Sequence, residues 1–532
     1  MAWSTLHNMT GHVRNPSSLL SFFNPVAFSS LFVIAAAGLA CSGTDGGEIA
    51  GSGGQIAAAG SSNSVAGTSA GGASNAAGAP TNTGGSVSDA GGTAGAPTTA
   101  GGSGSVAGGG NVAGGGSVAG AASVAGSGNV AGSGSGGAGG STGGTHWVGT
   151  WTASPYATAS DGQPPIGLSN AVARQITHAS LGGNQIRVQF SNIQGTKPLE
   201  IKAAHVALCK ATPLVDGSID TTTDKALAFS GMPNVTIPAG KEIWSDPLDF
   251  ALPALGNLTI TTAFGANVPT DTTLTSHNGA RTTSYVVANS TDVSAANMTS
   301  SPNKNQHWWI ISGVDVMAPA DAKGIVAIGD SITDGRGVTV DANNRWTDDL
   351  AKRLHDNAAT ANVSLMNQGI GATVLVGATG TSAEARFARD VLGQSGVKYV
   401  IIFDGVNDIG GSSSTTTTYN SMKTVYDKLI KAGRDKGLLV YGATITPFNK
   451  PADTTQAANG YYSVDHETLR QQVNTYIRSG VFDGVIDFDA ALTDGKTPPS
   501  MLPAAKSTDG LHPGPEGYQM MADKVDLTLF TK

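Results

Sequence analysis

The sequence contains a serine, a histidine and an aspartate at positions from which they could carry out acyl transfer. Ser331 follows an apolar run in AIGDSITDG (327–335), and Asp509 precedes His512 by three residues in STDGLHPGPEGY (507–518). A serine hydroxyl becomes a nucleophile when a neighbouring base takes its proton, and that base needs a partner that fixes its tautomer. A three-residue turn lets Asp509 reach Nδ1 of His512 and leaves Nε2 for Ser331. We therefore predict a triad of these three residues.

Asn407 is a candidate for the oxyanion site that acyl transfer also requires. It follows an apolar strand in FDGVNDIG (403–410), and its side-chain amide can donate a hydrogen bond to a developing oxyanion. Taken alone, each of these segments also has a purely structural interpretation. Ser331 can cap the segment that follows it, Asp509 and His512 can form an exposed turn, and Asn407 can begin an Asn-Asp turn at the end of a strand.

The elements that must position these residues begin after Pro319. Segments with helical spacing, such as RWTDDLAKRLHD (345–356), separate four continuous apolar segments, GIVAIG (324–329), VKYVIIF (397–403), LLVYGAT (438–444) and GVIDF (484–488). Strands that are apolar on both faces indicate a parallel sheet covered by helices on both sides. Residues 320–532 are therefore predicted to form a three-layer α/β/α domain of the flavodoxin-like type. Its site is expected beyond the carboxyl ends of the strands.

Residues 146–319 show a different pattern, with short segments divided by Gly, Pro, Asn and Asp. Apolar and polar residues alternate at 186–190 and again at 258–261, which predicts two half-buried strands. Many short strands of this kind, without helical spacing between them, are typical of all-β domains. We therefore predict a β-sandwich-like domain that precedes the α/β domain.

The N-terminal part of the sequence predicts export and a linker. Residues 1–41 have the layout of a signal peptide, because the apolar run VAFSSLFVIAAAGLA (26–40) ends directly before Cys41. The sequence GLACSG also resembles a bacterial lipoprotein cleavage site, at which Cys41 would become lipidated; ordinary cleavage nearby is the alternative. Residues 42–145 are nearly all small or polar, so they cannot bury enough apolar surface to offset the entropy of ordering. We expect residues 42–145 to form a disordered Gly/Ala/Ser linker in an exported bacterial protein. The protein is either a lipoprotein held at the cell surface through Cys41 or a freely secreted protein.

Composition excludes several other classes of protein. The formal net charge is -8 with histidines neutral, and no basic surface favours nucleic acid as a partner. The two cysteines, Cys41 and Cys209, provide neither a disulfide framework nor a C-x-x-C pair for zinc. We expect no metal and no cofactor, and a membrane partner only through a lipid anchor on Cys41.

The four blocks GDS, NQGIG (367–371), GVND and DGLH, in this order and at compatible spacing, resemble the SGNH hydrolases, also called GDSL-type esterases and lipases. The resemblance covers residues 320–532, and residues 146–319 look more loosely like the β domain of some secreted members. It implies that Ser331 is the nucleophile, His512 the base and then the acid, and Asp509 the orienting carboxylate. It also implies an oxyanion hole made by the N–H of Ser331, the side chain of Asn407 and one further backbone N–H.

The position of that further donor departs from the family pattern. Related sequences usually carry a glycine where this chain has Ala372, with Gly371 just before it. An alanine N–H can still donate if its φ is negative, whereas a turn that needs a positive φ would strain the alanine. We expect a negative φ at Ala372 and retain Gly371 as the alternative donor.

The predicted function is hydrolysis of carboxylic esters through an acyl-enzyme. An exported enzyme with a β domain suggests acetyl or other short-chain esters of extracellular polysaccharide as substrates. An arylesterase or lipase that acts on small or lipid esters is the alternative. A protein of another class, with a dead α/β domain and a carbohydrate-binding β domain, would need a stacking platform formed by Trp147, Trp151, Trp308 and Trp309.

Overall fold

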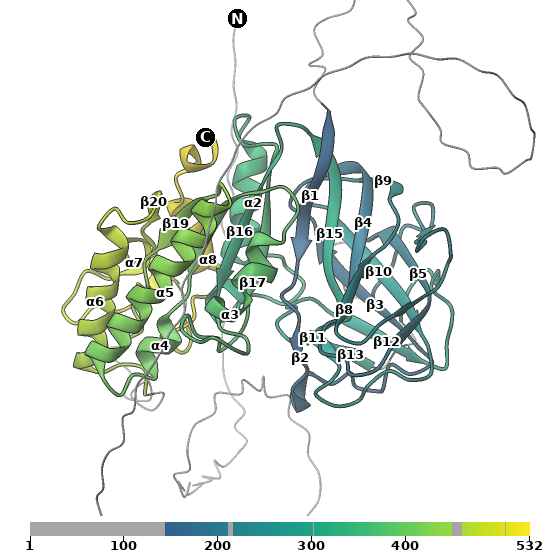
Figure 1. Ribbon diagram of the computed structural model, residues 1–532, viewed down its shortest axis with the longest axis horizontal. Coiled ribbons are helices and arrows are strands. Elements are labelled where there is room, and N and C mark those ends of the chain that lie inside the picture. The colour runs from purple at the N-terminus through teal and green to yellow at the C-terminus, as the bar shows by residue number, and fades with distance from the viewer. Residues whose placement is uncertain (1–143, 211–215, 300, 302, 450–459, 506) are drawn as a thin grey trace, which may run out of the picture. The chain divides into compact units, whose positions relative to one another are not determined.

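A five-stranded parallel sheet organises the C-terminal part of the chain, residues 320–532, which we call the α/β domain (Figure 1). The strand order is β17-β16-β18-β19-β20, and every pairing is parallel. The strands are β16 (Lys323–Gly329), β17 (Val363–Gly369), β18 (Val397–Phe403), β19 (Leu439–Ala443) and β20 (Gly484–Ile486). All four predicted apolar segments form strands, and β17 is an additional edge strand that the apolar runs do not reveal.

Helices connect these strands and pack against them, as expected for parallel pairing. The α2 helix buries Trp346, Leu350 and Leu354 on one face, which confirms the helical spacing predicted for residues 345–356. The α2 and α8 helices pack together, as do α5 and α6. The helices are α1 (Ser331–Asp334), α2 (Trp346–Asp356), α3 (Ala383–Phe387), α4 (Val406–Gly410), α5 (Thr415–Asp435), α6 (Val464–Arg478), α7 (Phe488–Leu492) and α8 (Pro515–Lys524), with a π-helical turn at Ala388–Leu392 after α3.

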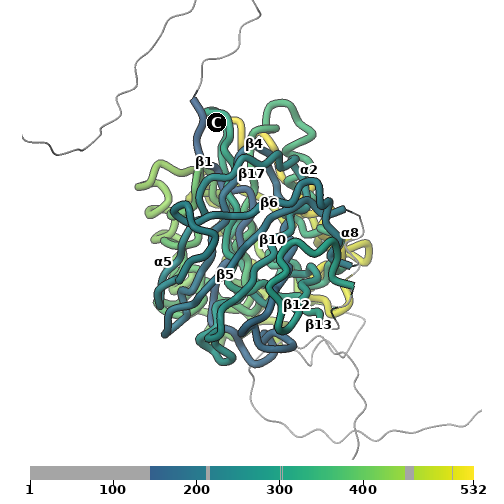
Figure 2. Tube along the Cα trace, turned by 90° about the vertical axis from the view of Figure 1, so that its right-hand side faces the viewer, coloured from purple at the N-terminus to yellow at the C-terminus, as the bar shows by residue number. Residues whose placement is uncertain are grey.

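Residues 144–319, which we call the β domain, are rich in antiparallel strands. One sheet has the order β1-β15-β4-β8, with β9 also paired to β4, and a second has the order β13-β12-β3-β10-β5-β6, with β7 on β5. The first contains β1 (Thr145–Thr152), β4 (Gly183–Asn192), β8 (Lys241–Trp244), β9 (Leu248–Leu252) and β15 (Ile311–Pro319). The second, in the foreground of Figure 2, contains β3 (Ala171–His178), β5 (Leu199–Leu208), β6 (Lys225–Ala226), β7 (Val235–Ile237), β10 (Asn257–Phe264), β12 (Ser284–Ala288) and β13 (Asn303–Asn305).

The two large sheets share one apolar core, which includes Val188 from the first and Ile260 from the second. A third, small sheet joins β2 (Tyr156–Ala157), β11 (Thr275–His277) and β14 (Trp308–Trp309). The prediction of a half-buried strand holds for β4 but is wrong for β10, because Thr259 and Thr261 are also buried. A second apolar cluster on that face of the sheet, including Val293, excludes water from these threonines.

The structure, a computed structural model, describes residues 144–210, 216–299, 301, 303–449, 460–505 and 507–532. The predicted signal peptide, Cys41 and the predicted linker up to residue 143 lie outside these residues. The described part of the chain belongs to one compact unit. Its helices are all too short or too polar to cross a membrane.

The β domain and the α/β domain meet along β1, which packs on the edge strand β17. Hydrogen bonds cross this boundary: Thr152 Oγ1 donates to the carbonyl of Asn367 at 3.2 Å, and the Leu365 N–H donates to Ser180 Oγ at 2.9 Å. The Gly149 N–H also donates to the carbonyl of Ser395 at 3.0 Å. The β1 strand thereby covers β17, an edge strand that contains polar residues.

Candidate active site

Ser331 is placed at the carboxyl end of β16 by a short turn of helix. The strand ends at Gly329, and Asp330 caps the α1 helix through its side chain, whose Oδ1 accepts the N–H of Ile332 at 2.9 Å. The helix stops at Gly335, which has a left-handed φ of 94° that glycine adopts without strain. Because Asp330 provides the cap, the hydroxyl of Ser331 is left for another partner.

That partner is His512, which the loop before α8 brings over the end of the sheet. Ser331 Oγ lies 2.8 Å from His512 Nε2, and His512 Nδ1 lies 2.7 Å from Asp509 Oδ2. The second carboxylate oxygen of Asp509 accepts the backbone N–H groups of Leu511 and His512, at 3.0 and 2.8 Å. The structure therefore brings the three predicted residues together, in the order in which a proton would move between them.

The charges of this hydrogen-bonded chain suit proton transfer. Burial lowers the pKa of the His512 imidazole below its ordinary value; Asp509 acts in the opposite direction, and the nearby charges of Arg336 and Arg281 lower it further. Burial by itself would raise the pKa of Asp509, but hydrogen bonds from His512 and Leu511 hold it well below its usual range. A neutral imidazole beside an ionised carboxylate can accept the proton of Ser331 at neutral pH.

Asn407 lies in the first turn of α4, after Gly405, whose φ of 124° makes the sharp exit from β18 possible. The side-chain amide of Asn407 is held from both ends: Nδ2 donates to the carbonyl of Thr373 at 2.6 Å, and Oδ1 accepts from the hydroxyl of Tyr461 at 2.6 Å. One N–H of Nδ2 remains for another acceptor. Asn407, Ser331, Gly371 and Ala372 all line the pocket that contains the triad.

Three backbone amides are also candidate donors. Across the described ranges of the chain, no acceptor receives the N–H of Ser331, Gly371 or Ala372. Asp408 holds this region together, because its carboxylate accepts the N–H groups of Leu375 and Val376 at 2.7 and 3.0 Å. The loop that carries Gly371 and Ala372 is thereby tied to the helix that carries Asn407.

The expected negative φ at Ala372 is wrong, because the structure has a φ of 60° there. The reason is local: the chain reverses immediately after β17, and this turn uses a left-handed residue at position 372. An alanine in this conformation costs about 1 kcal/mol or more, because its Cβ approaches the neighbouring carbonyl. Gly371, whose φ is not positive, does not need to be a glycine for this turn.

We expect Ala372→Gly to raise the free energy of unfolding by up to about 1 kcal/mol. Glycine relieves the left-handed strain, although part of the gain is lost because glycine is more flexible in the unfolded chain. Chemical denaturation of both proteins measures the difference. The control is Ala432→Gly inside α5, which should lower stability by about 1 kcal/mol; an equal loss at position 372 would refute the strain.

Three carboxyl groups that are partly or fully buried lie beside the candidate active site. Burial raises the pKa of Asp330 to about 7, and burial together with the neighbouring Asp330 carboxyl raises the pKa of Asp404 well above its ordinary value. Burial also raises the pKa of Asp408 to about 6, although the N–H groups of Leu375 and Val376 act in the opposite direction. These raised pKa values reflect the cost of bringing like charges together away from water.

The triad opens into a pocket of about 650 Å³ that both domains line. The α/β domain supplies the predicted triad and oxyanion donors, together with Tyr461 and Arg336. The β domain supplies the opposite wall, which is mostly polar and includes Asp161, Asn278, Arg281, Asn305, Gln306 and His307. The sequence analysis misses this wall because its residues lie in loops without a motif, and only the fold brings them to Ser331.

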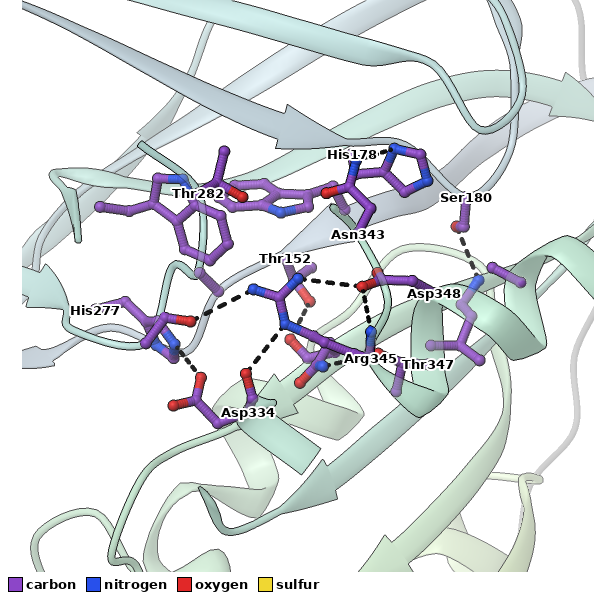
Figure 3. A pocket seen from close by; sticks show the side chains of 17 residues that line it. Thr152, His178, Ser180, His277, Thr282, Asp334, Asn343, Arg345, Thr347 and Asp348 are labelled. Carbon is purple, nitrogen blue, oxygen red and sulfur yellow. Dashed lines mark hydrogen bonds and ion pairs between the residues drawn. The ribbon is translucent and has the colours of Figure 1, made fainter. Parts of the chain in front are cut away.

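A buried hydrogen bond between His277 and Asp334 joins the β domain to the turn that carries the nucleophile (Figure 3). His277 Nε2 lies 2.8 Å from Asp334 Oδ1, while His277 Nδ1 lies 2.9 Å from the carbonyl of Ser154. Arg281 is 3.4 Å from the other oxygen of Asp334. Burial alone would raise the pKa of Asp334, but His277, Arg281 and Arg345 together lower it.

Arg345, at the start of α2, also lies at the boundary between the two domains (Figure 3). Its Nε donates to the carbonyl of Asp334 at 3.0 Å, and its guanidinium also donates to the carbonyl of Ala280 in the β domain. Gly279 packs so closely that a Cβ there would overlap with the Asp334 carboxylate. The loop at 277–281 is thus fitted directly against the α1 turn.

Two further features bear on the predicted alternatives. Trp151, Trp308 and Trp309 are buried in the core of the β domain, and Trp147 stacks on Arg187, so these tryptophans do not form the stacking platform that the carbohydrate-binding alternative would need. In the described part of the chain, no three His, Cys, Asp or Glu side chains gather as metal ligands would.

A serine, a histidine and a carboxylate in hydrogen-bonded sequence, with amide donors beside the serine, have the same arrangement as the triad of serine hydrolases. Residues 325–525 match the family model of the GDSL-like lipases and acylhydrolases. This segment is therefore a GDSL-like lipase/acylhydrolase domain.

Solved structures similar to this chain include a GDSL-like lipase from Bacteroides thetaiotaomicron, with 18% identity over 39% of this chain and 87% of that chain and a TM-score of 0.27. Another is a catalytic mutant of an acetylxylan esterase from Geobacillus stearothermophilus, with 18% identity over 38% of this chain and 91% of that chain and a TM-score of 0.28. A comparison with curated proteins found no match.

Proposed function

We propose that the protein is a carboxylic-ester hydrolase that works through an acyl-enzyme on Ser331. The observation that carries this proposal is the unbroken series of hydrogen bonds from Asp509 through His512 to Ser331, which ends in an open pocket. A dead α/β domain would not need this arrangement. The proposed three-layer architecture agrees with the parallel sheet and with the helix pairs that pack on it.

In the proposed mechanism, His512 Nε2 takes the hydroxyl proton as Ser331 Oγ forms a bond to the ester carbonyl carbon. The carbonyl oxygen becomes an oxyanion, and the amides of Ser331, Ala372 or Gly371, and the side chain of Asn407 donate to it. His512 then returns the proton to the alcohol oxygen as the carbon–oxygen bond breaks. Water repeats the cycle on the acyl-serine and releases the acid.

The lining of the pocket supports a short acyl group and a hydrophilic alcohol. Leu511 is the one large aliphatic side chain among the described residues of the lining, and the β domain contributes mainly amides and charged groups. A long acyl chain needs apolar surface to leave water, at about 25 cal/mol per Å². We therefore favour acetyl or other short esters of a saccharide over lipid esters. The exported location is part of this proposal, and fatty-acid labelling of Cys41 tests its lipid anchor.

We expect kcat/KM for p-nitrophenyl esters to be highest for acetate to butyrate and to fall by tenfold or more at octanoate. The fall reflects the lack of apolar surface for the longer chain, since each methylene left in water forfeits about 0.8 kcal/mol of burial. Steady-state kinetics across the series measure it. A maximum at octanoate or beyond would instead support the lipase alternative, and release of acetate from acetylated polysaccharide separates a saccharide esterase from an arylesterase.

A further inference from the structure

Arg336 lies in the wall of the active-site pocket, directly after the α1 turn that carries Ser331. Its backbone is fixed: its N–H donates to the carbonyl of Ser331 at 2.9 Å, and its carbonyl accepts from the hydroxyl of Tyr518 at 2.6 Å. The side chain is half-buried, yet within the described ranges no group pairs with its guanidinium. Partly buried charges are usually paired, so this cation is available to a ligand.

The other charged groups of the pocket are engaged or solvated. Asp334 is held by His277 and Arg281, and Asp509 by His512. Asp161, on the β-domain side, is exposed, so water screens its charge. Arg336 is therefore the half-buried charge of this pocket that has no counterion among the described residues.

The position of Arg336 assigns it to the alcohol side of the ester. The oxyanion donors at Gly371, Ala372 and Asn407 fix the carbonyl oxygen, so the alcohol oxygen of the ester must face His512. His512, by contrast, must protonate the departing alcohol, and Arg336 lies on the His512 side: its carbonyl accepts the hydroxyl of Tyr518 in α8, the helix after His512, and the adjoining Gly337 packs on Pro513. A negative group recognised by Arg336 would thus belong to the alcohol.

We propose that Arg336 binds a carboxylate on the alcohol part of the substrate, which makes the substrate an O-acylated acidic saccharide such as a polymer of uronic acids. This inference rests on the proposed esterase function. A guanidinium suits this role because its planar fork of donors matches a carboxylate. Asn278, Asn305, Gln306 and His307 on the facing wall offer hydrogen bonds to sugar hydroxyls. The net charge of -8 acts from a distance and is largely screened at physiological salt.

The test compares acetate release from O-acetylated polygalacturonate with release from the same polymer after its carboxylates have been converted to amides. The wild type should prefer the anionic polymer in kcat/KM. Arg336→Ala should lower this preference roughly tenfold, because a hydrogen bond to a charged group contributes at that level. Arg336→Lys should keep most of it, since the charge remains, and added salt should reduce it in the wild type.

The control is Arg434→Ala on α5, which removes an exposed guanidinium that pairs with Asp483 outside the pocket and should leave the preference unchanged. Equal rates on the two polymers, or an equal loss on both in Arg336→Ala, would overturn the inference. A preference for p-nitrophenyl succinate over the acetate that depends on Arg336 would also overturn it, because it places the carboxylate on the acyl side. Failure to hydrolyse even p-nitrophenyl acetate would instead refute the esterase function.

Discussion

Replacement of Ser331 by alanine is expected to lower kcat for p-nitrophenyl acetate on the order of 10⁶-fold, as in other serine hydrolases. The reason is that Ser331 Oγ is the atom that His512 Nε2 can deprotonate, at 2.8 Å. Without it no acyl-enzyme forms, and the remaining amide donors support little turnover. The fold should be retained, because the substitution removes one hydrogen bond, worth about 1 kcal/mol.

The matched control for this change is Ser364→Ala in β17, which removes another buried serine hydroxyl of the same domain. In the part of the chain that the structure describes, the Ser364 hydroxyl has no hydrogen-bond partner, so its loss should leave activity intact. Mass spectrometry after fluorophosphonate treatment should place the adduct on Ser331. An adduct on a different serine, or activity that survives Ser331→Ala, would show that the nucleophile is elsewhere.

Asp509→Asn is expected to lower kcat by up to roughly 10⁴-fold with little change in KM. Asp509 Oδ1 accepts two backbone N–H groups, so in an asparagine the carbonyl oxygen must stay there. The amide NH₂ then takes the place of Oδ2 and donates to His512 Nδ1. This stabilises the tautomer that carries its proton on Nε2, which cannot accept the proton of Ser331.

The comparison variant is Asp526→Asn, because the Asp526 carboxylate also accepts a backbone N–H, from Thr528, but is exposed and outside the pocket. Its activity should match that of the wild type. Burst and steady-state kinetics of both variants separate a loss in the chemical step from a loss in binding. A decrease of less than about threefold for Asp509→Asn would reduce this residue to a part of the turn.

The sequence predicts the parts of the site whose reactive residues lie in short motifs. Ser331, Asp509 and His512 are recognised because a nucleophile at a strand end needs a base and an orienting group, and the two segments that carry them meet in a parallel sheet. The other four strands, β16, β18, β19 and β20, are recognised by their continuous apolar runs. The β17 strand is not, because Ser364, Asn367 and Gln368 interrupt its apolar run and β1 covers it.

Other parts depend on contacts that no local pattern encodes. The left-handed conformation of Ala372 is set by the turn after β17, and alanine gives no sign of it. The burial of Thr259 and Thr261 is set by residues 293–298, which lie on the same face of the sheet. The β-domain wall of the pocket arises because the loop at 277–281 lies against α1, more than 50 residues further along the chain.

The contact between His277 and Asp334 has a consequence for any attempt to transfer this hydrolase domain to another protein. Asp334 and Ser331 share one turn of helix, so a shift of the loop at 277–281 reaches the nucleophile within that turn. A chain cut at residue 320 would leave the Asp334 carboxylate without His277 and Arg281, and water would replace the contacts that now fix the α1 turn. A transferred hydrolase domain must therefore keep the loop at 277–281, because the proposed active site needs both domains.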